Sequence, residues 1–316
     1  MMESALSFKG SNEALSILFV VGKWGIGGVE RVTIVLANAF IARGWRVAVA
    51  AFGFDDRSLL SGSSDKVEVV EIGGTWFSRE NQRKLAAMIR RRQVDFVINQ
   101  WCLPYRVTRF LNGAMKGTSA KLIAVHHNQP DRNRRLADAR NAFSRFAWRT
   151  LTRLDLRLVY ADSDAYVVLS RRYVEILRRF ISLGSSEKIH VIANPLTLNA
   201  VSECSKENVI LYVGRLEESQ KRVSRTLSTW AKIACRLPDW RLEIVGDGPD
   251  RLRYEDMAKG MERISFLGSQ NPSASYAKSK ILLLTSDFEG FPLVLAEAMA
   301  HGCVPVVHDG FPAAND

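Results

Sequence analysis

The chain has 316 residues, 47% of them hydrophobic, which suits two globular domains of ordinary size with a core each. No apolar run approaches the length of a membrane-spanning helix, and Ile17–Val21 is too short for the core of a signal peptide. The formal net charge of +11 favours an anionic partner, so nucleic acid, anionic lipid and nucleotide phosphates are all candidates at this level.

The first predicted strand, Leu15–Val21, is followed by a glycine-rich loop over residues 22–28 and by a helical pattern, Val29–Arg43. This order is typical of the opening of a nucleotide-binding domain. The spacing differs from the G-x-G-x-x-G fingerprint, which weakens any interpretation as a nicotinamide or flavin site. Gly27 and Gly28 let the backbone approach a ligand at the start of the helix; a tight turn without a ligand is the alternative.

Strand and helix patterns then alternate. The predicted strands are Arg46–Phe52, Val67–Ile72, Val94–Asn99 and Lys121–His126, and the predicted helices are Arg79–Arg92 and Pro104–Met115. This alternation predicts an α/β fold with a parallel sheet covered by helices on both faces. Ligands bind beyond the carboxyl ends of such strands, so a histidine at the end of the last strand, His126 or His127, is either a site residue or an ordinary loop residue.

A stretch rich in arginine and aromatic residues, Asp131–Tyr160, comes next. On a helix, Phe143, Phe146 and Ala147 share one face while several arginines lie elsewhere. Such a helix can lie on an anionic membrane, or it can be a solvated helix whose arginine stems cover the domain. Nucleic acid is a third candidate, but no recognised binding motif accompanies the charge, so we expect no nucleic-acid partner.

The first half closes with a predicted strand, Ala165–Ser170, a basic helix, Arg171–Ile181, and the segment Lys188–Pro195. The polar segment Asn199–Asn208 indicates a linker between domains. The predicted domains are therefore residues 1–198 and 199–316.

The second domain opens with the predicted strand Val209–Val213. Arg215 and Lys221 follow it, six residues apart, just before a predicted helix. Two cations beside a helix N-terminus suit a diphosphate; ordinary surface charge is the alternative. Two further strands are predicted at Arg241–Val245, before a turn that contains Gly246 and Gly248, and at Arg263–Phe266, before Leu267.

The most informative stretch lies between two apolar runs, Ile281–Leu284 and Val304–Val307, which predict two more strands. A helix between them is expected to have Pro292 at its first position and Gly302 in the left-handed conformation past its end. Glu289 then lies at the mouth of this helix, and Glu297 lies about one and a half turns inside it. The free N–H groups there suit an anion, and the carboxylates could accept hydrogen bonds from sugar hydroxyls; acidic residues with a structural role are the alternative.

The residues from Glu289 to Gly302 resemble the E-x(7)-E signature of retaining glycosyltransferases of sequence family 4, which have the GT-B fold. The similarity extends to Gly-Gly-Val-Glu-Arg from residue 27, to the histidine near residue 127, to Ile-x-Asn-Pro from residue 192, and to Gly214, Arg215 and Lys221. The resemblance implies two Rossmann-like domains with parallel sheets that face a central cleft. It covers nearly all of the chain.

The resemblance also implies roles for the matching residues. His127, with His126 as its substitute, and Glu289 would be catalytic residues that face the donor sugar. The donor diphosphate would be held by Arg215, Lys221, Gly27 and Gly28, and the nucleoside and sugar by Glu297, Gly246, Gly248, Leu267, Gly290, Phe291, Pro292 and Leu293.

The expected reaction is transfer of a sugar from a UDP- or GDP-sugar to a hydroxyl of a glycan or lipid-linked acceptor, with retention at the anomeric carbon. The resemblance places it in bacterial cell-surface polysaccharide, lipopolysaccharide or glycolipid synthesis. Four scattered cysteines fit a reducing cytoplasm and have no metal-like spacing. Arg215, Lys221 and helix N-termini could balance the leaving diphosphate, so neither a metal nor a cofactor is expected. The expected location is the cytoplasm, with peripheral attachment to the inner face of the plasma membrane.

Two other functions stay open. One is a nucleotide-sugar epimerase or hydrolase of the same architecture, and the other is a non-catalytic partner subunit that binds nucleotide sugars. Family members continue for several tens of residues beyond the position of Asp316 and return a last helix to the first domain. The resemblance thus implies a chain truncated at its C-terminus, and it makes the activity of these 316 residues a question for experiment.

Overall fold

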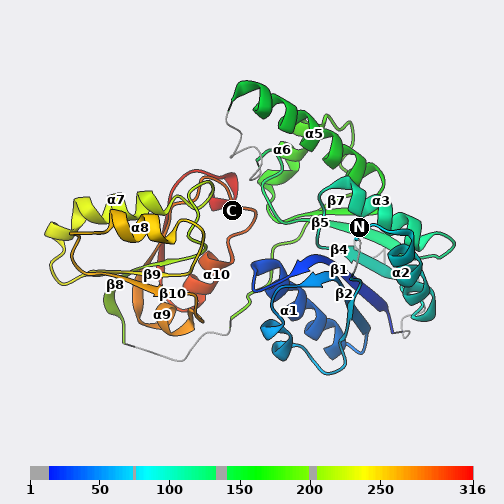
Figure 1. Ribbon diagram of the computed structural model, residues 1–316, viewed down its shortest axis with the longest axis horizontal. Coiled ribbons are helices and arrows are strands. Elements are labelled where there is room, and N and C mark those ends of the chain that lie inside the picture. Colours follow the sequence, from blue (N-terminus) through cyan, green and yellow to red (C-terminus); the bar gives the residue numbers. More distant parts are fainter. Residues whose placement is uncertain (1–13, 74–75, 133–140, 199–204, 316) are drawn as a thin grey trace. The chain divides into compact units, whose positions relative to one another are not determined.

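The computed structural model describes residues 14–73, 76–132, 141–198 and 205–315. The chain divides into two compact units. The first comprises Met1–His127, Leu154–Val168 and Ser186–His190, and the second comprises Asn128–Arg153, Leu169–Ser185 and Val191–Asp316. Each unit contains one sheet (Figure 1). The predicted boundary at residues 198 and 199 adjoins a segment outside the described residues, and it stays a prediction.

The first unit is built on a seven-stranded sheet with the order β3-β2-β1-β4-β5-β6-β7. Its strands are β1 Ser16–Trp24, β2 Arg46–Phe54, β3 Glu68–Glu71, β4 Phe96–Asn99, β5 Lys121–His126, β6 Ala165–Val168 and β7 Ile189–Val191. The pairs from β3 to β6 are parallel. The predicted parallel α/β architecture is therefore confirmed for this part of the chain.

Helices pack on both faces of this sheet because alternate residues of its central strands point to opposite sides. Leu18 and Val20 of β1 join a core with α2 (Arg79–Arg91) and α3 (Tyr105–Met115). Ile17 and Phe19 join a second core with α1 (Gly28–Ala42). The other helical elements described before Glu207 are η2 (Ser58–Gly62), α5 (Ala142–Ala161) and α6 (Arg172–Ile181); α6 and the residues of α5 up to Arg153 are part of the second unit.

The second unit contains a five-stranded parallel sheet with the order β10-β9-β8-β11-β12. Its strands are β8 Glu207–Val213, β9 Arg241–Val245, β10 Ile264–Gly268, β11 Ser279–Leu284 and β12 Val304–Val307. Its helices are α7 Val223–Ile233, α8 Arg251–Met257, α9 Ser273–Lys278 and α10 Leu293–Ala300, with 3-10 turns η3 Ala234–Arg236 and η4 Pro312–Asn315. One core joins α7 and α8 to the sheet, and another joins α9 and α10 to its opposite face (Figure 1).

Several boundaries differ from the sequence prediction, and three of them bear on the predicted site or the predicted linker. β1 continues to Trp24, through the first residues of the predicted glycine loop, because Lys23 and Trp24 still pair with β2. The predicted linker ends before Glu207, where β8 begins. Pro292 is the N-cap of α10 and not its first helical residue, with an extended ψ of 99°. Gly302 has φ +74°, as expected for the residue past the helix end.

Lys206, one residue before β8, ties together three segments of the second unit. Its ammonium group donates to the backbone carbonyls of Tyr276 at 3.0 Å, Ser279 at 2.9 Å and His301 at 2.6 Å. These carbonyls lie in α9, at the start of β11 and just past α10. A single side chain thus satisfies backbone acceptors at two helix ends, which the helices themselves leave without partners.

Candidate functional site

Two loops of the second unit meet beyond the carboxyl ends of neighbouring strands, β8 and β11. Thr285 donates from its hydroxyl to the carbonyl of Lys221 at 3.1 Å, and the N–H of Asp287 donates to the carbonyl of Gln220 at 2.9 Å. The Gln220 amide donates in turn to the carbonyl of Phe288 at 3.0 Å. Adjacent parallel strands deliver their loops to the same edge of a sheet, so residues about 65 positions apart form one surface.

The centre of this surface is an ion pair between two predicted site residues. Lys221 Nζ lies 2.5 Å from Glu289 Oε1, and the side chains are only 17% and 8% exposed. Tyr173, in the same unit, donates its hydroxyl to the backbone carbonyl of Glu289. Two charges can remain this far out of water because each neutralises the other. The structure thus brings Lys221 and Glu289 together.

Arg215 lies at the start of the β8 loop with a side chain that is 55% exposed. Its guanidinium is 3.3 Å from the buried carboxylate of Glu217, and its carbonyl accepts a hydrogen bond from Tyr212 at 3.1 Å. The backbone of Arg215 is therefore held, while its charged end stays accessible to an anion.

Asp287 holds the two loops in place through a pair of arginines that the sequence analysis did not single out. Arg222 Nε and Arg225 Nη1 donate to its two carboxylate oxygens at 2.6 and 2.5 Å. Burial alone would raise the pKa of Asp287, but these hydrogen bonds and charges lower it below its usual value. The charged network fixes the loop that leads into Glu289.

Glu297 is buried in α10, and both of its carboxylate oxygens accept hydrogen bonds from hydroxyl groups. Thr197 donates to one oxygen at 2.5 Å, and Tyr276 donates to the other at 3.0 Å. The carboxylate of Glu297 is therefore held by side chains from two other segments of the second unit. The sequence analysis missed Thr197 and Tyr276 because they are far from Glu297 in the chain.

The residues between Glu289 and α10 form the helix mouth. Gly290 and Pro292 are buried, whereas Phe291 and Leu293 are partly exposed. Pro292 makes no side-chain cap, so the first N–H groups of this eight-residue helix have no capping side chain. The helix mouth therefore offers donors next to the Lys221–Glu289 pair.

Gly246 and Gly248 have a clear structural reason for being glycine. A Cβ at Gly246, which has φ +140°, would lie 1.9 Å from the carbonyl oxygen of Gly214. A Cβ at Gly248 would lie 2.4 Å from the carbonyl oxygen of Leu216. The β9 loop thus packs directly on the backbone of the β8 loop, while Leu267 of β10 remains 37% exposed.

In the first unit, His127 directly follows β5 and is partly exposed. Its Nε2 lies 2.5 Å from Gln100 Oε1. Burial, and then the neighbouring His126, lower the pKa of His127 to about 4, so the ring is neutral at pH 7. Because an amide oxygen only accepts, Nε2 carries the proton and Nδ1 is left as an acceptor.

The first unit contains two further features from the sequence analysis, His126 and the glycines at the start of α1. His126, the last residue of β5, is buried and its ring stacks on Tyr166 at 6.2 Å. The N-terminus of α1 carries Gly27 as an extended N-cap. Glu30, which the sequence analysis passed over, folds back to accept from the N–H of Gly25 at 3.2 Å. A Cβ at Gly27 would lie 2.5 Å from this carboxylate, so glycine makes room for it.

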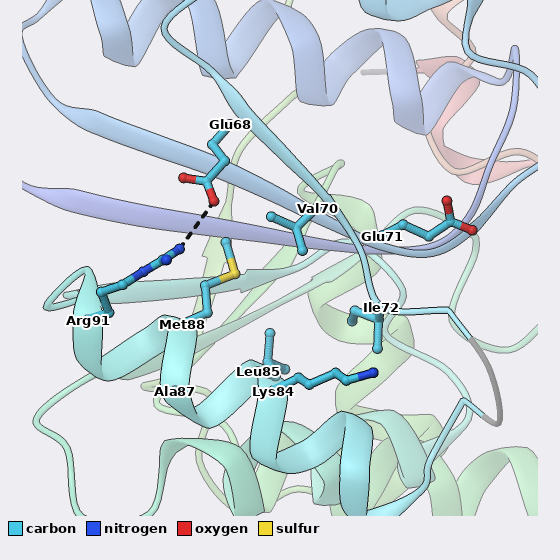
Figure 2. A pocket seen from close by; sticks show the side chains of 9 residues that line it. All are labelled: Glu68, Val70, Glu71, Ile72, Lys84, Leu85, Ala87, Met88 and Arg91. Carbon is cyan, nitrogen blue, oxygen red and sulfur yellow. Dashed lines mark hydrogen bonds and ion pairs between the residues drawn. The ribbon is translucent and has the colours of Figure 1, made fainter.

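A separate hollow lies between the edge strand β3 and α2 (Figure 2). Figure 2 shows Val70, Ile72 and Met88 on its apolar lining. The acidic residues at its rim are already paired, Glu68 with Arg91 at 3.5 Å and Glu71 with Arg57 at 2.7 Å. The paired rim charges leave no obvious catalytic group, so we assign no chemistry to this hollow.

Two general searches complete the description. Within residues 14–315, apart from the gaps given above, no group of three or more His, Cys, Asp or Glu side chains is arranged to hold a metal ion. Among the helices in the same part of the chain, none is long and apolar enough to cross a bilayer.

Comparison with known proteins gives two family matches. Residues 26–199 match the model described as Glycosyltransferase Family 4, and residues 207–315 match the one described as Glycosyl transferases group 1. An uncharacterized glycosyltransferase of Haemophilus influenzae is 28% identical over 300 residues, which cover 92% of this chain and 78% of the relative. The lipopolysaccharide 1,6-galactosyltransferase of Salmonella typhimurium is 34% identical over 145 residues, which cover 42% of this chain and 40% of the relative.

Solved structures support the same fold. The lipopolysaccharide outer core galactosyltransferase WaaB superposes with a TM-score of 0.66 at 22% identity, over 94% of this chain and 82% of that protein. HepE of Anabaena, solved in complex with UDP and glucose, gives a TM-score of 0.72 at 17% identity, over 95% and 82%. The predicted GT-B fold is thus confirmed.

Proposed function

The chain belongs to glycosyltransferase family 4, and we propose that it transfers a sugar from a nucleoside-diphosphate sugar to an acceptor hydroxyl with retention at the anomeric carbon. The observation that carries this proposal is the buried Lys221–Glu289 pair beside the uncapped start of α10. A cation, a carboxylate and a helix N-terminus without a capping side chain suit a sugar that is leaving a diphosphate.

In this mechanism, the incoming diphosphate takes Lys221 and Arg215 as its counter-charges. Glu289 is then freed from its ion pair and faces the sugar ring, where it stabilises the positive charge that develops at the anomeric carbon. The bond from that carbon to the phosphate oxygen breaks, and a bond to the acceptor oxygen forms on the same face. The leaving phosphate oxygen takes the acceptor proton.

The remaining residues bind and orient the substrates. Glu297 accepts hydrogen bonds from the ribose hydroxyls, and the neutral His127 offers Nδ1 to a sugar hydroxyl. The two cations and the helix N-termini offset the diphosphate charge, so we propose that no divalent metal and no cofactor takes part. The donor is a UDP- or GDP-sugar.

The acceptor is proposed to be a glycan or lipid-linked glycan of the bacterial cell surface. Several related proteins support this proposal by their names, among them the lipopolysaccharide 1,6-galactosyltransferases of Salmonella typhimurium and Escherichia coli. A further relative, from Campylobacter jejuni, is named as a transferase that extends an undecaprenol-linked glycan, and it matches 90% of this chain at 24% identity.

The phosphate contacts provide the test. Arg215→Ala should slow transfer and weaken donor binding, with a loss of about 2–4 kcal/mol in transition-state stabilisation. Lys221→Ala should show the same kinetic loss together with lower thermal stability, since Glu289 stays buried without its partner. Lys259→Ala, an exposed ion-pair residue of the same unit, is the matched control. Wild-type kinetics in the Arg215 variant would refute the proposed phosphate contact.

The two alternative functions are separated by product analysis. A hydrolase or epimerase would release or convert the sugar of the donor when no acceptor is present. A non-catalytic partner subunit would bind the donor, measured as thermal stabilisation across a panel of nucleotide sugars, and give no turnover with any acceptor. Transfer that depends on both donor and acceptor supports the proposal against both.

The location is proposed to be the cytoplasmic face of an anionic membrane, and helix α5 carries this proposal. Five large apolar side chains on α5 are exposed: Phe143 by 81%, Phe146 by 70%, Trp148 by 36%, Leu151 by 52% and Leu154 by 53%. Ala147, Leu151 and Leu154 follow Phe143 at helical spacing, so they form one ridge. Arg145, Arg149, Arg153 and Arg157 are exposed on the same helix.

Exposed aromatic rings beside arginines suit a surface with anionic headgroups above acyl chains. We expect the protein to bind vesicles that contain phosphatidylglycerol and to release them as salt rises. Phe143→Ser combined with Phe146→Ser should abolish this binding, whereas Leu252→Ser, at an 80% exposed position on α8, should not. Equal binding to neutral and acidic vesicles would contradict the proposal. The predicted basic stretch began at Asp131, and its residues 133–140 lie outside the described residues.

A further inference from the structure

A second hollow in the first unit lies between the packed helices α2 and α3. It measures about 420 Å³ and is lined by Phe77, Gln82, Arg106, Arg109, Phe110 and Gly113. The spacing of the two helices at this hollow depends on Gly113, because a Cβ at this position would lie 2.1 Å from the Gln82 amide nitrogen. That amide instead donates to the carbonyl of Phe110 at 3.0 Å and fixes the two helices at this distance.

Two arginines on one face of α3 border this hollow. Arg106 and Arg109 are both exposed, and no carboxylate in the described part of the chain forms an ion pair with either. The Arg106 guanidinium lies 5.3 Å from the centre of the Phe77 ring, which holds it at the rim. Guanidinium groups match phosphate and carboxylate oxygens in pairs, so two of them beside a hollow suit an anionic ligand.

The hollow is connected to the edge of the sheet where His127 lies. Phe77 stacks on Trp101 with ring centres 6.1 Å apart, and Trp76 packs on the same indole at 5.2 Å. The Trp101 ring lies so close to β1 that a Cβ at Gly22 would be 2.8 Å from it. Trp101 directly follows Gln100, the partner of His127. An aromatic wall thus runs from the carboxyl ends of β1 and β4 to the two arginines.

We propose that this hollow is an acceptor subsite for an anionic sugar, one that carries a phosphate or a carboxylate. Arg106 and Arg109 bind the anionic group, and the half-buried ring of Phe77, which Trp101 supports from behind, contacts the apolar face of the sugar. The inference deepens the proposed function, on which it rests, because it names the acceptor as an acidic glycan. A neutral acceptor would leave both arginines without a role.

The test measures the direct binding of acceptor probes to the protein in the absence of donor, so that no turnover occurs. Binding is monitored through the Nε–H signals of the arginines in NMR spectra. Glucose 6-phosphate and glucuronic acid are the probes, with glucose and inorganic phosphate as comparisons. Both acidic sugars should bind at least tenfold more tightly than either comparison, and they should shift the signals of Arg106 and Arg109. Arg106→Ala and Arg109→Ala should each lower this affinity at least tenfold.

Arg90→Ala is the matched control, because Arg90 is an exposed arginine on α2 that lines a different hollow. Phe77→Leu keeps an apolar side chain and should weaken acidic sugars while leaving inorganic phosphate unchanged. If inorganic phosphate binds with the same affinity as glucose 6-phosphate, the inference is overturned, because the hollow is then a simple anion site. Unchanged affinity in both arginine variants would also overturn it. Binding of the nucleotide-sugar donor is measured in a separate experiment. Its failure would count against the proposed function, whereas failure of acidic-sugar binding would count against the acceptor subsite only.

Discussion

Glu289 and Glu297 belong to one signature, yet their surroundings predict different kinetic roles. Glu297 is held by two hydroxyl donors deep in α10, as suits a residue that binds the ribose equally in the ground state and transition state. Glu297→Gln should therefore mainly raise the donor KM. Glu289 is paired with Lys221 at the helix mouth, so Glu289→Gln should mainly lower kcat.

Steady-state kinetics with varied donor distinguishes the two effects, and both substitutions keep the size of the side chain. Circular dichroism is the control for folding. If both variants lose their fold and the folded fraction shows no change in kcat or KM, both glutamates have a structural role.

His127 provides a pH prediction. Its pKa is lowered from the ordinary 6.5 to about 4, first by burial and then by His126. Between these two values the unfolded chain binds a proton that the folded chain does not, so the free energy of unfolding must fall as the pH falls from 6.5 to 4. Above about pH 7.5 this residue contributes no pH dependence, because both states are neutral.

Urea unfolding at intervals from pH 7.5 to 4.5 measures this slope. His127→Asn should flatten it, and the exposed His190→Asn should not. Gln100→Glu offers a second check, since a carboxylate at the Nε2 contact favours the charged ring and should raise the pKa of His127 in NMR titration. An unchanged titration in that variant would mean that Gln100 does not position the ring.

At the scale of elements, the contacts of Lys206 predict a stability effect. Its ammonium group satisfies three carbonyls at the ends of α9 and α10 and at the start of β11. Lys206→Met keeps the stem but removes the ammonium donor, so that only the weakly donating Cys303 thiol remains near the carbonyls of Tyr276 and Ser279. We expect the free energy of unfolding to fall by about 1–3 kcal/mol. Lys259→Met, on an 80% exposed side chain, should change it little. Equal stabilities in urea would show that water replaces the ammonium group.

The sequence predicts those elements whose signals are local. The apolar runs of β1, β2, β8 and β11 and the glycine past α10 all follow from neighbouring residues, and the structure confirms them. Pro292 was placed one position too far into its helix, because an N-cap and a first helical residue both suit a proline with φ near −65°.

The hydrogen-bond partners of the site residues cannot be predicted from local sequence patterns. Thr197 and Glu297 are 100 positions apart, and Gln100 and His127 are 27 apart. Only the packing of the folded chain decides which hydroxyl or amide meets which charged or titratable group. Family resemblance supplied the predicted roles of Arg215, Lys221 and Glu289. The contacts of Asp287 with Arg222 and Arg225, which fix their loops, are visible only in the structure.

At the scale of the whole molecule, the predicted donor residues are mostly carried by the second unit, which holds Arg215, Lys221, Glu289 and Glu297. A ligand stabilises the segments that it contacts, by about 2.7 kcal/mol at a concentration one hundred times its Kd. Donor at that concentration should therefore slow amide hydrogen exchange most in residues 214–222 and 285–293. Slower exchange of residues 25–30 would support the predicted role of Gly27 and Gly28.

Hydrogen exchange with mass spectrometry follows these segments separately. Arg215→Ala should reduce the protection by weakening donor binding, and the Lys259→Ala control should retain it. Glucose 6-phosphate, the probe of the proposed acceptor subsite, should instead protect the segments around Phe77 and Arg106. If the donor does not slow amide exchange in residues 214–222 and 285–293, it does not bind to the two loops that follow β8 and β11.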